Sequence, residues 1–263
     1  MCTIILLNGV RDDAPLVIAA NRDEYRRRPW RGPEVLTAAP RIVGGRDIDR
    51  GGTWLALRAD GYFAAVTNHR THRPADASRS SRGHVVLDVL ACGGVEAMTT
   101  HVSALDGSDF NPFNLAFGHA GDVRVAYARG ERAAIDVHTV PRGVHVLTND
   151  VLDSPSMPKV FRTLDAVLPA RDAPWPELEA SLRTALADHT LPPIERIAAP
   201  PDESMFTRET LQSLQCVCVH LDGYGTVCAT IARLTADRVV SYAFAAGAPC
   251  TTPWQDFTDL ARP

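Results

Sequence analysis

The sequence begins MCTIILLNG (residues 1–9), with a cysteine immediately before a run of apolar residues. A short apolar run of this length favours a buried strand. Cys2 then has two interpretations. A free cysteine packs in a core as a small hydrophobe. Alternatively, removal of Met1 leaves Cys2 with both a thiol and a free α-amine, which is a nucleophile with its own base attached.

Length and charge narrow the class of protein. The chain has 263 residues, 45% of them apolar, which fits one large domain over residues 1–263. Its formal charge of −4 provides no basic field for nucleic acid. The first apolar run ends before Arg11, too soon for a secretory signal or a membrane span. We expect a cytoplasmic protein with reduced thiols, and its oligomeric state stays undefined.

Strand-like runs, bounded by turn residues, recur along the chain. They are residues 3–8, 16–20, 53–58, 62–67, 113–117, 123–128 and 144–148. The pair Asp60-Gly61 predicts a hairpin turn, and residues 214–244 predict a three-stranded meander. Residues 26–40, 69–82 and 191–208 are expected to be irregular.

Two amphipathic helices are expected between the strand groups. Residues 81–94 have apolar side chains at helical spacing before a glycine pair. Residues 173–190 have Pro176 near the start and leucines that repeat every four residues. Two groups of antiparallel strands with inserted helices predict an α+β layered fold.

The second strand leads into the charged segment AANRDEYRRRPW (residues 19–30) and is expected to end at Asn21. If the first two strands are neighbours, Asn21, Arg22 and Asp23 lie near Cys2. A cation beside a thiol lowers its pKa from about 8.5, and a carboxylate can orient the α-amine. The other interpretation is a solvated turn with local ion pairs.

Several motifs lie in the same order along nearly the whole chain. They are MCT (1–3), AANRDE (19–24), GGTWLAL (51–57), AAVTN (64–68), FNLAFG (113–118), LTN (147–149) and GYGT (223–226). Together they resemble the NRDE-motif family, also called the transport and Golgi organisation family. The resemblance implies a fold of the N-terminal-nucleophile hydrolase type, a four-layer αββα sandwich with mostly antiparallel sheets.

In enzymes of that fold that cleave penicillin V and conjugated bile salts, a terminal cysteine attacks an amide carbonyl. The resemblance therefore implies that Cys2 is the nucleophile and that Asp23 orients its amine. It implies that Asn68 and Asn149 are oxyanion donors, each typically worth about 2.7–4 kcal/mol of transition-state stabilisation. Arg22 is the expected active-site cation.

Three further residues, Asn21, Trp54 and His69, are expected to bind the substrate. Two positions differ from the family pattern, because Ala20 and Val227 stand where those hydrolases usually carry arginine. Two functions therefore stay open. One is a cysteine amidohydrolase or acyltransferase that acts on a small amide or acyl substrate through a thioester on Cys2. The other is a non-catalytic protein that binds and traffics haem, or acyl-coenzyme A and lipid, in the same cleft. Neither requires a cofactor, and haem is a candidate ligand.

The segment CVCVH (residues 216–220) is expected to place Cys216, Cys218 and His220 on one face of a strand. Three such ligands could bind zinc or copper. No further ligands at a recognised spacing are evident, so we assign no metal and prefer buried packing. His72 and the arginines of residues 26–31 are read either as solvent-exposed or as ligand contacts.

Overall fold

A computed structural model describes residues 2–262, and its strands form two seven-stranded antiparallel sheets. The strands of the first sheet, in spatial order, are β10 (Gly143–Leu147), β1 (Thr3–Asn8), β2 (Leu16–Tyr25), β12 (Tyr224–Leu234), β13 (Val239–Ala245) and β14 (Trp254–Asp256), with β11 (His220–Leu221) beside β12. Those of the second are β3 (Trp30–Ala38), β4 (Arg41–Asp47), β5 (Leu55–Arg58), β6 (Tyr62–Asn68), β7 (Phe113–His119), β8 (Asp122–Ala128) and β9 (Asp136–Thr139).

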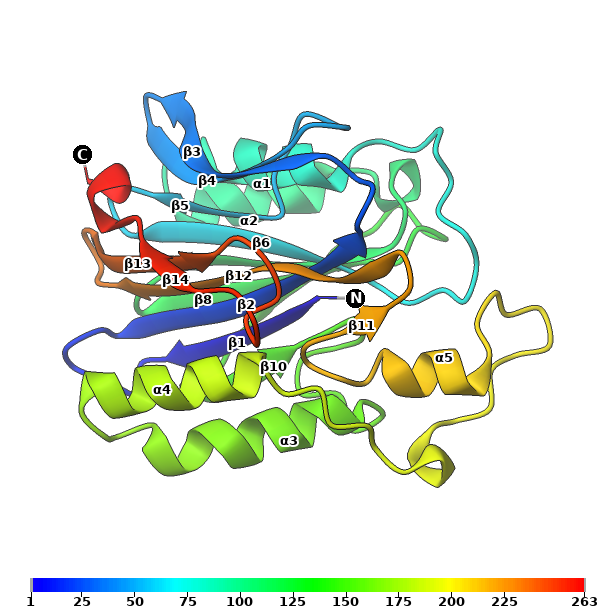
Figure 1. Cartoon of the computed structure of the whole chain (residues 1–263). Helices are drawn as coiled ribbons and strands as arrows, with labels where there is room; N and C mark the ends of the chain where they lie inside the picture. The colour runs from blue at the N-terminus through cyan, green and yellow to red at the C-terminus, as the bar shows by residue number, and fades with distance from the viewer. Residues whose placement is uncertain (1, 263) are drawn as a thin grey trace.

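Helices cover the outer faces of the two sheets (Figure 1). The α-helices are α1 (Arg82–Leu90), α2 (Val95–Ala104), α3 (Pro158–Val167), α4 (Trp175–Leu186) and α5 (Arg208–Ser213). Short 3₁₀ helices are η1 (Gly107–Asp109), η2 (Leu168–Ala170), η3 (Ile194–Arg196) and η4 (Thr258–Ala261). Helices α1 and α2 pack on the second sheet and α3 and α4 on the first, which gives the expected αββα sandwich.

Strand β1 shows how the apolar run builds this sandwich. Ile4 and Leu6 enter the core between the two sheets, whereas Ile5 and Leu7 enter the core beneath α4. Side chains of a strand alternate between its faces, so a central strand covered on both faces needs apolar residues at every position. The predicted buried strand is confirmed, and the structure shows that it is covered on both faces.

The hairpin at Asp60-Gly61 is also confirmed: β5 and β6 pair across it, and Gly61 has a φ of +90°. An added Cβ at Gly61 would lie 2.4 Å from the carbonyl oxygen of Thr235, so both the backbone angle and the close approach favour glycine. Within residues 2–262, no helix has the length and apolar character needed to cross a membrane.

Three expectations about secondary structure were wrong. Strand β2 continues past Asn21 to Tyr25, because β12 pairs with it over that extension. Residues 26–40 contain β3, which lies at the edge of its sheet and tolerates Pro33 through register shifts in its pairing with β4. Residues 214–218 form turns and bends and residue 219 is irregular, so the first strand of the expected meander is reduced to β11.

Candidate active site

Cys2 lies at the end of β1, where the pairing of the first two strands places it beside the charged end of β2. Thr3 pairs with Asn21 in that antiparallel register, so Cys2 continues the ladder opposite Arg22. Cys2 is partly exposed and lines a cavity of about 300 Å³. Burial raises the pKa of the Cys2 thiol; the nearby Asp23 carboxylate acts in the same direction and the Arg22 guanidinium in the opposite one.

The Asp23 carboxyl is buried and held by a chain of hydrogen bonds. The Thr226 hydroxyl donates to Asp23 Oδ1 at 2.6 Å, and the same hydroxyl accepts the Val219 N–H at 2.9 Å. Burial raises the pKa of Asp23, although Lys159 and the Thr226 hydrogen bond lower it. Asp23 also lines the cavity around Cys2. The carboxyl is therefore fixed in direction by a residue of β12.

Lys159 is the sole lysine of the chain and no part of it is exposed. It stands in the first turn of α3, and its Nζ donates to the carbonyl of Cys216 at 3.4 Å. Burial lowers the pKa of Lys159, and the Asp23 carboxylate opposes that effect. A lysine and a carboxyl group thus share one buried region next to the cysteine.

Two arginines supply positive charge near Cys2. Arg22 is buried. The Cζ atom of its guanidinium lies 4.2 Å from the centroid of the Trp54 ring, and its Nη2 lies 3.9 Å from Oδ2 of Asp47. Its Nη1 is buried and has no hydrogen-bond partner among the described residues. Arg82, at the start of α1, lines the same cavity, and burial lowers its pKa. Val227, the position in β12 where a cation was expected, lies in the apolar core between the sheets. The cations near Cys2 come instead from β2 and α1.

Asn68 and Asn149 meet where the two sheets come together. Asn149 follows β10 and is buried, and its Nδ2 donates to the backbone carbonyl of Asn68, the last residue of β6, at 2.6 Å. The backbone carbonyl of Asn149 accepts the Arg70 N–H at 2.9 Å. The buried Oδ1 of Asn149 has no hydrogen-bond partner among the described residues. These contacts fix the amide of Asn149 at the cleft.

A second cavity of about 490 Å³ adjoins the first, because Asp23, Asn68 and Arg82 line both. Asn149 and His69 line the second cavity, and burial lowers the pKa of His69. Apolar side chains form much of its remaining wall: Tyr25, Met205, Phe206, Leu214, Leu221 and Tyr224. The cleft therefore has a polar part around Cys2 and a more apolar part beside it.

The structure brings most of the predicted site residues to this cleft. Cys2, Asp23, Arg22, Asn68 and Trp54 line the first cavity, and Asn149 and His69 line the second, as stated above. Their proposed roles in chemistry stay predictions.

Asn21 lies elsewhere, which corrects its expected placement beside the substrate. Strand alternation turns Asn21 toward α4, where its Nδ2 donates to the carbonyls of Leu186 and Val217 at 2.8 and 2.9 Å. The side chain is buried and lines none of the cavities described above. Its amide fastens the end of α4 to the sheet.

Sequence reasoning missed Thr226, Lys159 and Arg82 as parts of the site. Thr226 ends the GYGT motif, and Lys159 is distinguished as the sole lysine, so both carried a signal. Arg82 is one of many arginines and had none.

The fold has relatives among solved hydrolases. An N-acylethanolamine-hydrolyzing acid amidase ortholog from Caenorhabditis elegans aligns with a TM-score of 0.52 at 12% identity, covering 88% of this chain and 92% of that one. The C2A mutant of a conjugated bile acid hydrolase from Clostridium perfringens aligns with a TM-score of 0.51 at 13% identity, covering 98% and 93%. These similarities show the fold of N-terminal-nucleophile hydrolases.

Sequence comparison gives the family. The Transport and Golgi organization protein 2 homolog of Bos taurus is 30% identical over 239 residues, which cover 86% of this chain and 84% of the relative. The Homo sapiens homolog is 29% identical over 243 residues with the same coverage. Residues 1–243 match the profile of the family described as Transport and Golgi organisation 2. This chain therefore belongs to the Transport and Golgi organisation 2 family.

Proposed function

We propose that this protein is a cysteine amidohydrolase or acyltransferase of the N-terminal-nucleophile type, acting on an amide or ester of an apolar acyl group. The observation that carries the proposal is the convergence of Cys2, Asp23 and Arg22 on one cavity that opens into a more apolar one. An acyl chain would lie among the apolar side chains of the larger cavity, with its carbonyl beside Cys2. The two hydrolases of similar fold act on the substrates that their names give, and they support the choice of reaction class.

The proposed reaction needs a base within the site. Because burial raises the pKa of the Cys2 thiol, the resting thiol is protonated at neutral pH. In the proposal, Met1 is removed and the α-amine of Cys2, with a usual pKa of about 8, accepts the thiol proton. The Asp23 carboxyl orients that amine. The thiolate then attacks the carbonyl carbon to give a tetrahedral intermediate.

Collapse of the intermediate completes the first half of the reaction. The asparagines at 68 and 149 would donate to the oxyanion, and the α-ammonium returns its proton to the leaving amine or alcohol. The acyl group is left as a thioester on Cys2. Water, or an acceptor amine in the acyltransferase case, attacks the thioester and releases the thiol. Each proton taken from a nucleophile is thus returned to a leaving group.

Intact-mass measurement and turnover test this proposal together. We expect the mature protein to lack Met1 and to release a chromogenic amine from N-acyl nitroanilides, faster for long acyl chains than for short ones. Cys2→Ser and Cys2→Ala should lose turnover and retain the fold, while Cys92→Ser serves as control because Cys92 lies at the end of α1 and lines neither cavity. Retention of Met1 in an active protein would contradict the mechanism.

A binding function is the alternative, and one observation favours it. Arg70, Arg73 and Arg82 line the same cavity as its apolar residues, a combination suited to an amphiphilic ligand with carboxylate or phosphate groups. Haem and acyl-coenzyme A both have this character. Saturable binding of either to wild type and to Cys2→Ala, with no turnover of any acyl substrate by wild type, would support binding over catalysis.

A further inference from the structure

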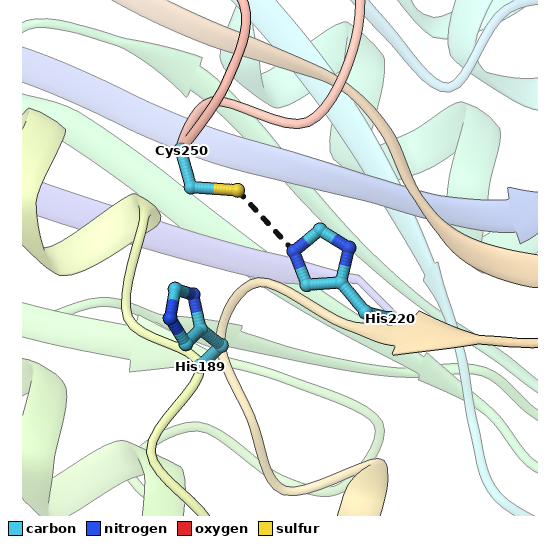
Figure 2. Close-up of side chains that lie close together, drawn as sticks. All are labelled: His189, His220 and Cys250. Atoms are coloured by element: carbon cyan, nitrogen blue, oxygen red, sulfur yellow. Dashed lines mark hydrogen bonds between the residues drawn. The ribbon is translucent and has the colours of Figure 1, made fainter.

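Four cysteine and histidine side chains lie together outside the cavities of the candidate active site. They belong to three segments: Cys218 and His220 at β11, His189 in the loop after α4, and Cys250 in the loop before β14. Figure 2 shows the side chains of His189, His220 and Cys250 gathered around one space. None of the four residues lines the cavities of the candidate active site. The cluster is therefore a separate feature.

The distances within the cluster match those between ligands of one metal ion. The Nε2 atom of His220 lies 3.4 Å from Cys218 Sγ and 3.2 Å from Cys250 Sγ, and the two sulfurs are 3.6 Å apart. Around tetrahedral zinc, with Zn–S of 2.3 Å and Zn–N of 2.0–2.1 Å, two sulfurs are separated by about 3.8 Å and a sulfur and a nitrogen by about 3.6 Å. Hence this trio already has nearly the required spacing.

His189 is the fourth candidate ligand, and it lies beside His220 and Cys250. A ring nitrogen of His189, a ring nitrogen of His220 and the Sγ of Cys250 all lie within 4.8 Å of one another. The rings of His189 and His220 meet edge to face, with centroids 5.8 Å apart. Both histidines are exposed and Cys250 is partly exposed, whereas Cys218 is buried. A metal ion can thus enter from solvent while being anchored on the buried sulfur.

Cys216 is bonded to backbone rather than to the other candidate ligands, which explains why the sequence pattern alone gave no ligand set. Its Sγ donates to the backbone carbonyl of His189 at 3.3 Å. The segment from Cys216 to Val219 is not a strand, so Cys216 and Cys218 do not share a face as expected. The missing ligands, His189 and Cys250, come from loops far away in the sequence.

We propose that Cys218, His220, Cys250 and His189 form a structural zinc site. Two thiolates and two imidazoles, with no carboxylate among them, are a donor set typical of structural zinc. Four protein ligands fill a tetrahedral shell and leave no position for substrate. The ion would tie the loop of Cys250 to the other two segments, which are already linked by hydrogen bonds from the N–H groups of Val217 and Cys218 to the carbonyl of Asp188.

The proposed zinc site is linked to the candidate active site through Val219. Cys218 precedes Val219, whose N–H binds the Thr226 hydroxyl that in turn holds Asp23. A metal ion on Cys218 would restrain this segment and the carboxyl that depends on it. The zinc thus acts as a positioning element for the site, whether the site catalyses or only binds.

Metal analysis of the full chain tests the proposal without any activity assay. The protein is reduced with a phosphine, desalted without oxygen, and titrated with Zn²⁺ or Co²⁺. We expect one ion per chain by native mass spectrometry, and the thiolate-to-cobalt charge-transfer band and d–d bands of a tetrahedral site. Cys218→Ser, Cys250→Ser and His220→Ala should each weaken binding by more than about 100-fold, since loss of a ligand exceeds the 10–100-fold effect of losing an outer-shell partner.

Cys92→Ser and Cys2→Ala are the matched controls, because they remove thiols outside the cluster, and both should bind as wild type does. Cys250 is partly exposed in a loop, so Cys250→Ser keeps the test valid if Cys218→Ser fails to fold. The proposal is overturned if reduced wild type retains no stoichiometric metal, if the cobalt complex lacks the thiolate band, or if Cys2→Ala loses as much affinity as Cys250→Ser. Rapid closure of a Cys218–Cys250 disulfide with no metal uptake overturns it as well.

Discussion

Replacement of Thr226 by valine should destabilise the protein and change the ionisation of Asp23. Valine keeps the shape of threonine but lacks the hydroxyl, so Asp23 Oδ1 and the Val219 N–H both lose a partner at a residue with no exposed surface. A buried polar group left without its partner costs about 1–3 kcal/mol, or more if charged. The free energy of unfolding should therefore fall by about 2–6 kcal/mol.

Thr226→Ser is the matched control, because it keeps the hydroxyl and removes one buried methyl group, at about 1 kcal/mol. Urea denaturation at neutral pH gives the free energy of unfolding for all three proteins. The Thr226 hydrogen bond lowers the pKa of Asp23, so its loss raises that pKa further. The Asp23 carboxylate raises the pKa of the Cys2 thiol, so protonation of Asp23 in Thr226→Val should shift the pH at which alkylation of Cys2 by iodoacetamide reaches half its maximum downward, in that variant alone. Equal stability of the valine and serine variants would refute the reasoning.

Three other substitutions give independent checks. Burial lowers the pKa of Lys159 from its ordinary value of 10.5. At pH values between the lowered pKa and 10.5 the folded state binds fewer protons than the unfolded state, so the free energy of unfolding increases as the pH rises through that range. Lys159→Met should abolish this rise with pH, measured by urea denaturation at pH values below 10.5, and, by removing a cation, should raise the pKa of Asp23; an unchanged pH dependence would contradict the reasoning. Asn21→Ala leaves two backbone carbonyls without their donor and should lower the free energy of unfolding by about 2–6 kcal/mol, yet leave the alkylation rate of Cys2 within about twofold. Arg82→Gln removes a cation that interacts with the Cys2 thiolate, so stopped-flow alkylation should be slower at neutral pH; a faster rate would assign Arg82 a different role.

The layered fold could be predicted because its central strands have a recognisable local sequence, namely short apolar runs bounded by turn residues. The centre of a strand covered on both faces must be apolar at every position, as residues 4–7 are, and a tight hairpin needs a residue such as Gly61. Edge strand β3 gave no such signal, because one side of it has no partner strand and its outer residues are half exposed. Helix α3 was missed although Pro158 at its first turn is a recognised start signal.

The candidate site was predictable where the strand register determines it. Cys2 and Arg22 follow from the pairing of two consecutive strands, and strand parity also sends Asn21 to the opposite face, a step that motif reasoning overlooked. The zinc ligands could not be predicted in the same way, since His189 and Cys250 lie in loops whose positions depend on the packing of the whole chain.

The burial of Lys159 has a practical consequence for labelling. Since it is the chain's sole lysine and has no exposed surface, an amine-reactive dye added to the native protein finds no lysine side chain to modify. Any lysine adduct must form during a transient opening of the first turn of α3. The rate at which that adduct forms, measured by peptide mass spectrometry, therefore reports how often the first turn of α3 opens beside the candidate active site.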